Sequence, residues 1–288
     1  MTDASDAPRP PLRERRTRSQ HVLTVLRTER LAEHLVRVHL GGEGVDGFLA
    51  EADPARLAVT DRYVKLLLPP AGSPLEPPFD LDALRASVAP EDLPVRRTYT
   101  VRSVGERSIA VDFVVHGDEG VAGPWAAAAR PGDRLAMSAP GGAWAPREDP
   151  AVAHLLLGDD SALPAIASAL EAMGPAARGL ALIEVGGAAD EVELSAPAGV
   201  EIRWLHRAAL EAGRALVAAV RAEARPEGAV EVFAHGERTA MKELRGILQG
   251  DWGIERSALS LSAYWALGRA EDRFQAEKRE PVGAIFDD

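Results

Sequence analysis

The stretch PVRRTYTVRS, residues 94–103, places Arg97, Tyr99 and Thr100 close together in a segment with strand character. In a strand, Arg97 and Tyr99 lie on the same face because side chains alternate. A guanidinium binds phosphate through paired hydrogen bonds, and a phenol ring stacks on other aromatic systems. Thr100 adds a hydroxyl or backbone amide that could reach a ring heteroatom. The pattern indicates a platform for a phosphorylated aromatic cofactor such as a flavin nucleotide; a solvated edge strand is the alternative.

The sequence around this stretch consists of short alternating segments joined by turns. Alternation of apolar and polar residues predicts half-buried strands. They occupy residues 21–42 (as a hairpin), 62–70, 97–104 and 108–116, with a short strand between two turns in 131–142 and a proline-rich excursion over 71–95. Several short strands connected by turns predict a small antiparallel β-barrel.

The second half of the chain changes period. Buried strands are predicted at residues 151–158, 179–187, 200–207, 228–237 and 258–265, and helices at 159–173, 209–225 and 238–249. Ser161 is the expected N-cap of the first of these helices. Alternating strands and helices predict a parallel sheet with helical crossovers. Because the composition shifts at APREDP, residues 145–150, we expect a disordered arm over 1–20, a barrel domain over 21–148 and an α/β domain over 149–288.

The composition restricts the classes of function. The 288 residues carry a net charge of −11, which argues against nucleic-acid binding. The absence of cysteine excludes disulfides, thiolate zinc sites and cysteine-ligated iron–sulfur clusters, and the histidines show no metal spacing. No apolar run approaches the about 20 residues of a membrane span, and no secretory signal is evident. We expect a cytoplasmic protein whose redox chemistry, if any, is carried by an organic cofactor or haem.

The segment 111–135 is a second candidate binding element. A strand ends at His116, Gly117 and Asp118 open a glycine-rich turn, and a helix is expected to begin near Pro124. Backbone amides at a helix N-terminus, approached through glycine, bind anions. The segment follows the Arg97 strand closely, so one ligand could touch both. The alternative is an ordinary connection with a hydrogen-bonded histidine at a strand end.

The first strand–turn–helix unit of the second half suits a dinucleotide but lacks G-x-G-x-x-G, and Asp159 and Asp160 are negative where a phosphate is expected. Glu184 follows this turn by about 25 residues, near the usual position of the acid that binds a ribose 2′-hydroxyl. Asp190 and Glu191 add negative charge. Such a cluster would repel a 2′-phosphate, and it therefore favours NADH over NADPH.

Five blocks follow one another along the chain: RTYT at 97–100, DFVVHGDEGVAGPWA at 112–126, PGDRLAMSAPGG at 131–142, LLLGDDSALPAI at 155–166 and YWALGRAED at 264–272. In this order they resemble the siderophore-interacting protein family, FAD-dependent ferric-siderophore reductases of the ferredoxin-reductase-like superfamily. The resemblance covers nearly the whole chain after about residue 20. It implies an antiparallel six-stranded FAD-binding β-barrel followed by a parallel-sheet nicotinamide-nucleotide-binding domain.

The resemblance also assigns cofactor contacts. The residues that it implies for the flavin are Arg97, Tyr99 and Thr100. For the ribityl and pyrophosphate part they are His116, Gly117, Asp118, Ala122, Gly123 and Trp125. For the nicotinamide nucleotide they are Asp159, Ser161, Gly236 and Glu237. In the turn after His116, the family's usual Pro, Ala, Ser run is replaced by Val121-Ala122-Gly123, so one hydroxyl donor is missing.

The sequence departs from the family after the Tyr-Trp pair. Ala266 and Leu267 stand where basic residues are usual, and Trp265 itself is expected to pack into the core. An acidic chain repels an anionic ferric chelate unless one face is locally basic, so the barrel strands should supply that face. The residues expected to contact the substrate are Lys65, Arg102 and Arg269, with Arg62 beside the first two.

The function that these features imply is flavin-dependent reduction of ferric siderophores with electrons from NAD(P)H, which releases Fe²⁺ because hard oxygen ligands hold Fe³⁺ better. A ferredoxin is the alternative electron donor. Two other functions stay open at this point. One is a general flavin reductase or electron-transfer flavoprotein of the same superfamily, and the other is a siderophore-binding carrier without catalysis.

Overall fold

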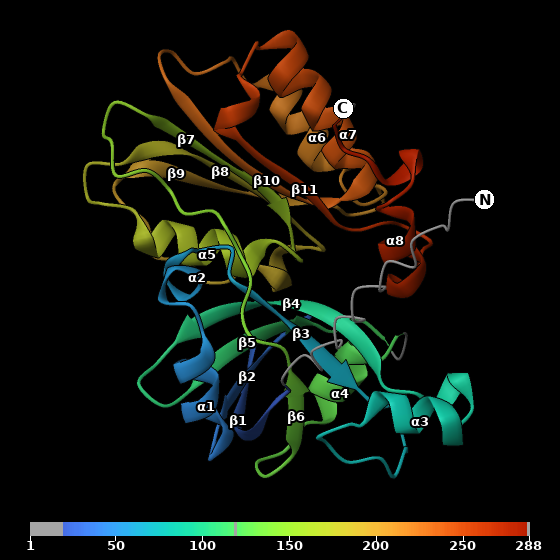
Figure 1. The fold of residues 1–288 in the computed structure, drawn as a ribbon. Coiled ribbons are helices and arrows are strands. Elements are labelled where there is room, and N and C mark those ends of the chain that lie inside the picture. Colours follow the sequence, from blue (N-terminus) through green and yellow to red (C-terminus); the bar gives the residue numbers. More distant parts are fainter. Residues whose placement is uncertain (1–19, 118–119, 287–288) are drawn as a thin grey trace, which may run out of the picture.

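The computed structural model describes residues 20–117 and 120–286, which form a barrel domain and an α/β domain stacked on each other (Figure 1). The predicted disordered arm, except for its last residue, and Asp118 lie outside the described residues. Within the described ranges, no helix combines the length and apolar character that a membrane span requires.

The N-terminal domain is a closed barrel of six antiparallel strands, which confirms the predicted architecture. The strands are β1 (His21–Ala32), β2 (Leu35–Gly41), β3 (Tyr63–Leu68), β4 (Val95–Val104), β5 (Ile109–Val114) and β6 (Arg134–Met137), in the order β1-β2-β5-β4-β3-β6. Alternation places Leu23 and Val25 of β1 in the core, where both are almost fully buried. The β3–β4 register pairs Lys65 with Thr98 and Tyr63 with Thr100, so a lysine-bearing strand lies beside the RTYT block.

Short helices connect the barrel strands. They are α1 (Gly44–Glu51), α2 (Pro54–Ala58), α3 (Leu81–Ser87) and α4 (Ala122–Ala128), with a 3-10 turn at Pro90–Asp92. The sequence patterns did not predict the first three, because each is too short to show a helical period. In the proline-rich excursion, the Asp80 carboxylate accepts hydrogen bonds from two backbone amides and so caps α3.

The C-terminal domain is a parallel sheet, also as predicted. Its strands are β7 (Ala153–Asp159), β8 (Arg178–Val185), β9 (Gly199–His206), β10 (Val230–Glu237) and β11 (Leu259–Trp265), in the order β11-β10-β7-β8-β9. Its helices are α5 (Leu163–Ala172), α6 (Arg214–Ala222), α7 (Arg238–Arg245) and α8 (Glu271–Glu277), with a π-helical turn at Gly246–Asp251. The strand order reverses between β7 and β10. Helix α8 was not predicted.

The two faces of this sheet are covered differently. Helices α6 and α7 share an apolar cluster with one face, and α5 covers the other, between the sheet and the barrel (Figure 1). The same cluster as α5 includes Leu35 of β2, so the two domains share a core. The buried Ser168 of α5 donates a hydrogen bond of 2.8 Å to the backbone carbonyl of Arg102. These contacts fix the barrel against α5 and so against this face of the sheet.

Candidate functional site

A cavity of about 510 Å³ lies between the two domains. The barrel lines it with Tyr63, Lys65, Arg97, Tyr99, Thr100 and His116. The α/β domain lines it with Asp160, Ser161, Arg207, Tyr264, Trp265 and, from α8 and the residue after it, Glu271, Gln275 and Lys278. In open α/β sheets, ligands bind outside the carboxyl ends of the strands, where the strand order reverses. Here that point lies at the ends of β7 and β10, beside the cavity.

Arg97 of β4, which the sequence predicts to bind a phosphate, lines the cavity. Its side chain is 16% exposed, whereas Asp272 of α8, with which it forms an ion pair, is 69% exposed. The guanidinium nitrogen lies 3.3 and 3.4 Å from the two Asp272 oxygens. Bonds of this length are weak compared with charge-assisted hydrogen bonds of about 2.8 Å. The guanidinium also donates to the Arg96 backbone carbonyl at 2.8 Å, so its contact with Asp272 is the weaker one, which a phosphate could replace.

Tyr99 and Tyr264 place two phenols at the same cavity, one from each domain. Tyr99 packs on Phe113 with 4.4 Å between ring centroids. Burial is the main cause that raises the pKa of each phenol. Both rings therefore stay neutral at physiological pH and can act as stacking surfaces and hydrogen-bond donors. Thr100, between them in sequence and space, is buried at the cavity wall.

The turn after β5 is divided between the cavity and the core. His116 lines the cavity, and Gly117 has a φ of +55°, which favours glycine. Ala122 is buried, and Trp125 packs on Phe113 with ring centroids 5.7 Å apart. The predicted contacts of Gly117, Ala122, Gly123 and Trp125 with a flavin's phosphates therefore stay predictions, since none of the four lines the cavity.

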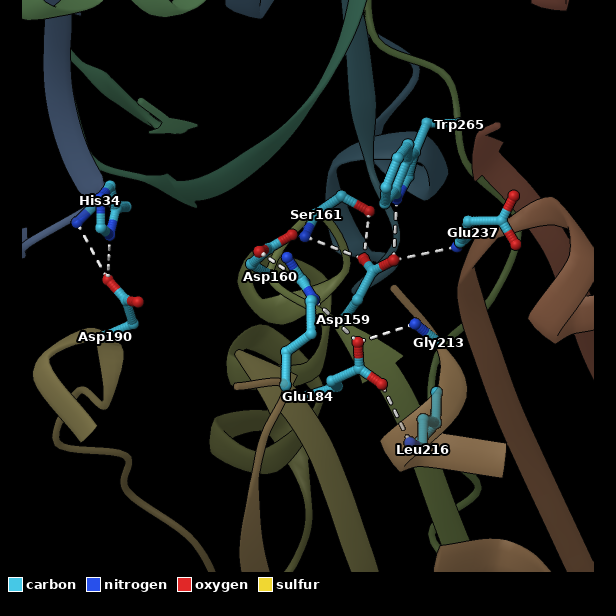
Figure 2. A network of polar contacts seen from close by, with 11 residues as sticks. His34, Asp159, Asp160, Ser161, Glu184, Asp190, Gly213, Leu216, Glu237 and Trp265 are labelled. Carbon is cyan, nitrogen blue, oxygen red and sulfur yellow. Dashed lines mark hydrogen bonds and ion pairs between the residues drawn. The ribbon is translucent and has the colours of Figure 1, made fainter. Parts of the chain in front are cut away.

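Asp159 is the centre of a hydrogen-bond network at the end of β7 (Figure 2). One of its oxygens accepts from the Ser161 amide and hydroxyl, and the other accepts from the Glu237 amide and the Trp265 indole. Two expectations are corrected. Trp265 lines the cavity rather than the core, because its indole bonds to Asp159 at 2.8 Å. Ser161 is not the N-cap of α5, because its hydroxyl bonds to Asp159 and the helix begins at Leu163.

Gly236 and Glu237, predicted to contact the nicotinamide nucleotide, act within the protein. The Glu237 carboxylate is buried, caps α7 by accepting from the Thr239 and Ala240 amides, and also accepts from the Leu267 amide. A Cβ atom at Gly236 would lie 2.7 Å from an Asp159 oxygen. Glycine is therefore required there because the Asp159 carboxylate comes close to the backbone.

Glu184, the predicted ribose acid, is completely buried and already bonded. Its oxygens accept from the amides of Gly213 and Leu216, at 2.7 and 3.0 Å, and from the Arg207 guanidinium (Figure 2). Arg207 lines the cavity and also donates to Asp160 at 3.1 Å. Glu184 therefore fixes the start of α6 and orients Arg207, and the prediction that it contacts a ribose is wrong.

The other two carboxylates of the predicted acidic cluster are likewise engaged. Asp190 accepts from the backbone amide of His34 at 3.0 Å and lies 2.8 Å from its ring nitrogen, which joins the α/β domain to the barrel (Figure 2). Glu191 lies 2.7 Å from the His206 ring. Neither residue lines the cavity. The repulsion of a 2′-phosphate that the sequence suggested therefore loses its structural basis.

Lys65 and Lys278 are cations at the cavity that form no ion pair within residues 20–117 and 120–286. Lys65 comes from β3 of the barrel, and Lys278 follows α8. The Lys278 ammonium lies 4.7 Å from the centre of the Phe274 ring. Burial and the charge of Lys65 lower the pKa of Lys278, against an opposing effect of Glu271. Two like charges at one cavity, offset only in part by Glu271, favour an anionic ligand between them.

The other predicted substrate residues lie elsewhere. Arg102 is buried and forms two hydrogen bonds with Glu171 of α5, so it joins the domains. Arg62 donates to backbone carbonyls of the barrel and of Arg102. Arg269 donates to Glu277 at 2.9 Å, and it does not line the cavity. Of the expected basic face, the structure brings Lys65 alone to the cavity.

Three contributors to the site had no clear signal in the sequence. Lys278 is one of three lysines in the chain, but no motif connects it with Lys65. Helix α8 is seven residues long, too short for a helical period to be evident. Arg207 follows a predicted strand, and its role depends on Glu184, which lies on the neighbouring parallel strand.

A barrel joined to a parallel sheet, with a cavity at the carboxyl ends of the strands, is a two-domain fold that known structures share. The FAD/NAD-binding domain of nitric oxide dioxygenase from Vibrio cholerae has this fold, with a TM-score of 0.58 at 14% identity over 85% of this chain and 98% of that one.

The family is shown by sequence. The family model described as siderophore-interacting FAD-binding domain matches residues 24–144, and the model described as siderophore-interacting protein matches residues 151–268. The chain belongs to the siderophore-interacting protein family.

Individual relatives agree with this assignment. The ferric vibriobactin reductase ViuB of Vibrio cholerae is 32% identical over 92% of this chain and 96% of its own length. The NADPH-dependent ferric-chelate reductase of Escherichia coli is 34% identical over 70% of this chain and 77% of its own length. The crystal structure of the siderophore-interacting protein SipS from Aeromonas hydrophila matches with a TM-score of 0.76 and 27% identity, over 93% of this chain and 99% of that one.

Proposed function

We propose that this chain reduces ferric siderophores with electrons that NAD(P)H delivers through bound FAD. The observation that carries the proposal is the shared cavity, in which a loosely paired arginine, two neutral phenols and two unpaired lysines come together from both domains. Two of its relatives are named as ferric reductases.

The residues of the barrel wall fit FAD. Arg97 offers a guanidinium whose present partner is weak, and Tyr99 presents an aromatic ring beside it. Thr100 offers a hydroxyl at the same wall. Bound FAD would supply the redox chemistry, because a flavin can accept a hydride from NAD(P)H and release electrons one at a time to ferric ions. The task of this chain is to hold the ring, exclude water from it and admit donor and acceptor.

The substrate contacts that we propose are Lys65 and Lys278. They lie on opposite domains of the cavity, so a siderophore carrying carboxylates or catecholates would be held between barrel and α8. Lys278 supplies the charge that Ala266 and Leu267 do not. Reduction to Fe²⁺ weakens the hold of hard oxygen ligands, and no acid–base group is needed on the iron side.

The donor nucleotide is proposed to be NADH or NADPH with little discrimination. Glu184, Asp190 and Glu191 are all bonded within the protein, so they do not repel a 2′-phosphate at the cavity. We expect the second-order rate constants for flavin reduction by the two nucleotides to agree within about tenfold. This corresponds to a difference of about 1.4 kcal/mol in free energy. A hundredfold preference for NADH would restore the role predicted for the acidic cluster.

Stopped-flow reduction of the FAD-loaded protein by NADH and by NADPH, followed by mixing with a ferric siderophore, tests the proposal directly. Both half-reactions should proceed, with Fe²⁺ trapped by a chelator. A general flavin reductase would instead reduce free flavins or cytochromes faster than ferric siderophores. A carrier would bind the siderophore but show no flavin absorption after incubation with FAD. If a ferredoxin reduces the flavin and NAD(P)H does not, only the proposed electron donor is wrong.

A further inference from the structure

Asp159 is an unusual carboxylate because four hydrogen-bond donors converge on it, while no cation among residues 20–117 and 120–286 pairs with it. It is completely buried at the end of β7. Its four donors are the amide and hydroxyl of Ser161, the amide of Glu237 and the indole of Trp265 (Figure 2). A carboxylate in this position is stabilised by dipoles rather than by an opposite charge.

The same carboxylate connects three strand ends at the cavity. Asp159 ends β7, Glu237 ends β10 and Trp265 ends β11. The β7–β10 junction is where the strand order reverses, and therefore where a nucleotide is expected to lie. Trp265 and Ser161 line the cavity there, while Asp159 itself is behind them. Asp159 thus determines the position of groups that a nucleotide would touch, without touching it.

We propose that Asp159 is a positioning residue of the donor half-reaction: its ionised carboxylate holds the Trp265 indole where the nicotinamide nucleotide enters. This inference rests on the proposed function, because it assumes that a nicotinamide nucleotide donates at this cavity. Protonation would change the number of hydrogen bonds that the Asp159 carboxylate can accept. An ionised carboxylate accepts all four hydrogen bonds, whereas a protonated one loses a lone pair and gains an O–H that needs an acceptor of its own.

The charges around Asp159 make that change accessible near neutral pH. Burial and the neighbouring Asp160 raise the pKa of Asp159 to about 7, against the bonds from Ser161 and Trp265. The titratable or charged groups that face this pair from the surrounding elements are Glu184, Arg207, Glu237, Tyr264 and His116. Because the ionised form is the competent one, the donor half-reaction should weaken as pH falls through about 7.

The first test is the pH profile of flavin reduction by saturating NAD(P)H in stopped flow. Between pH 6 and pH 8 the ionised fraction of a group with a pKa of about 7 rises about tenfold, so the rate should rise by up to that factor. Asp159→Asn should flatten the profile and lower the limiting rate at pH 8 by about tenfold, with little change in nucleotide KM. Asp160→Asn should move the midpoint to lower pH, because it removes a like charge.

The second test needs no cofactor. The emission of Trp265, taken as the difference between the protein and Trp265→Phe, should titrate with a midpoint near 7 in the FAD-free protein and stay constant in Asp159→Asn. His116→Gln should keep the midpoint, which excludes the cavity histidine as its source. Glu231→Gln, a buried carboxylate on the same strand as Glu237, should also keep it.

The outcomes separate this inference from the proposed function. A flavin that NAD(P)H does not reduce at any pH overturns the proposed function, while the emission titration still reports on Asp159. Reduction by NAD(P)H with the same pH profile in Asp159→Asn overturns the positioning role. A Trp265 emission that does not change between pH 6 and pH 8 overturns it as well.

Discussion

The two walls of the cavity satisfy their charges in different ways. On the sheet wall, Asp159 and Glu184 are fully buried, and every oxygen accepts from protein donors. On the wall formed by the barrel and α8, Arg97 meets Asp272 only at 3.3 Å, and Lys65 and Lys278 have no carboxylate partner within the described ranges. The carboxylates of the sheet wall are fully hydrogen-bonded within the protein, whereas the other wall leaves cations available to a ligand.

This difference shows which charged residues can recognise a ligand. A buried charge whose hydrogen bonds are complete sets the shape of a site, because removing its partners costs more than a ligand returns. A cation with weak or absent partners gains from an anion. We therefore expect substitutions on the sheet wall to act through stability and through the positions of cavity residues, and those on the barrel wall and α8 to affect mainly ligand binding.

Glu184→Ala should produce the largest effect of this comparison. It leaves two buried amides and the Arg207 guanidinium without their acceptor. Breaking a buried ion pair in this way costs about 3–5 kcal/mol of the free energy of unfolding. Urea unfolding followed by tryptophan fluorescence measures this loss. Glu201→Ala, an exposed acid on β9, is the control and should change it by no more than about 0.5 kcal/mol. A loss below about 1 kcal/mol for Glu184→Ala would return Glu184 to the ligand-binding candidates.

The fold follows from the sequence more completely than the site does. All the strands were predicted to within a few residues, because alternation and buried runs are local patterns. The barrel wall was partly predictable for the same reason, since Arg97, Tyr99 and Thr100 lie on one strand. Glu184 was misjudged because its partners, near Gly213, are about 30 residues away, and no pattern announces that a carboxylate is already bonded. The short α8 and Lys278 were missed because their proximity to Lys65 exists only in the folded chain.

Arg97→Ala is the second test, now on the barrel wall. Loss of a charge-assisted contact to a phosphate should weaken FAD binding about ten- to hundredfold, or about 1.5–3 kcal/mol. Titration calorimetry with FAD measures the affinity. Arg96→Ala, the exposed neighbour on the opposite face of β4, is the matched control and should bind FAD as the unmodified protein does. Equal affinities for the two variants would remove Arg97 from the cofactor site.

Lys65→Ala and Lys278→Ala should each raise the KM for an anionic ferric siderophore about two- to fivefold, the range expected for partly exposed charges. Flavin reduction by NAD(P)H should not change, because only the oxidative half-reaction meets the siderophore. The effect should shrink with added salt. Burial and Lys65 lower the pKa of Lys278. As pH rises, its contribution to siderophore binding should therefore be lost at a lower pH than that of a lysine with an ordinary pKa. Lys242→Ala, whose ammonium bonds to the Val282 carbonyl, is the control.

Asp272→Asn should give the smallest effect and tests whether Arg97 is truly loosely held. FAD must displace Asp272 from Arg97, so removing this competing carboxylate should tighten FAD binding, by about two- to threefold, because a pair at 3.3 Å with an exposed carboxylate contributes little. The gain should disappear in the double variant with Arg97→Ala, because the two substitutions act on one contact. Asp82→Asn, an acid exposed on α3 away from the cavity, should leave the affinity as it was. If Asp272→Asn weakens FAD binding, the carboxylate supports the cofactor site. The contrast between a fully hydrogen-bonded sheet wall and a barrel wall with available cations then does not hold for Arg97.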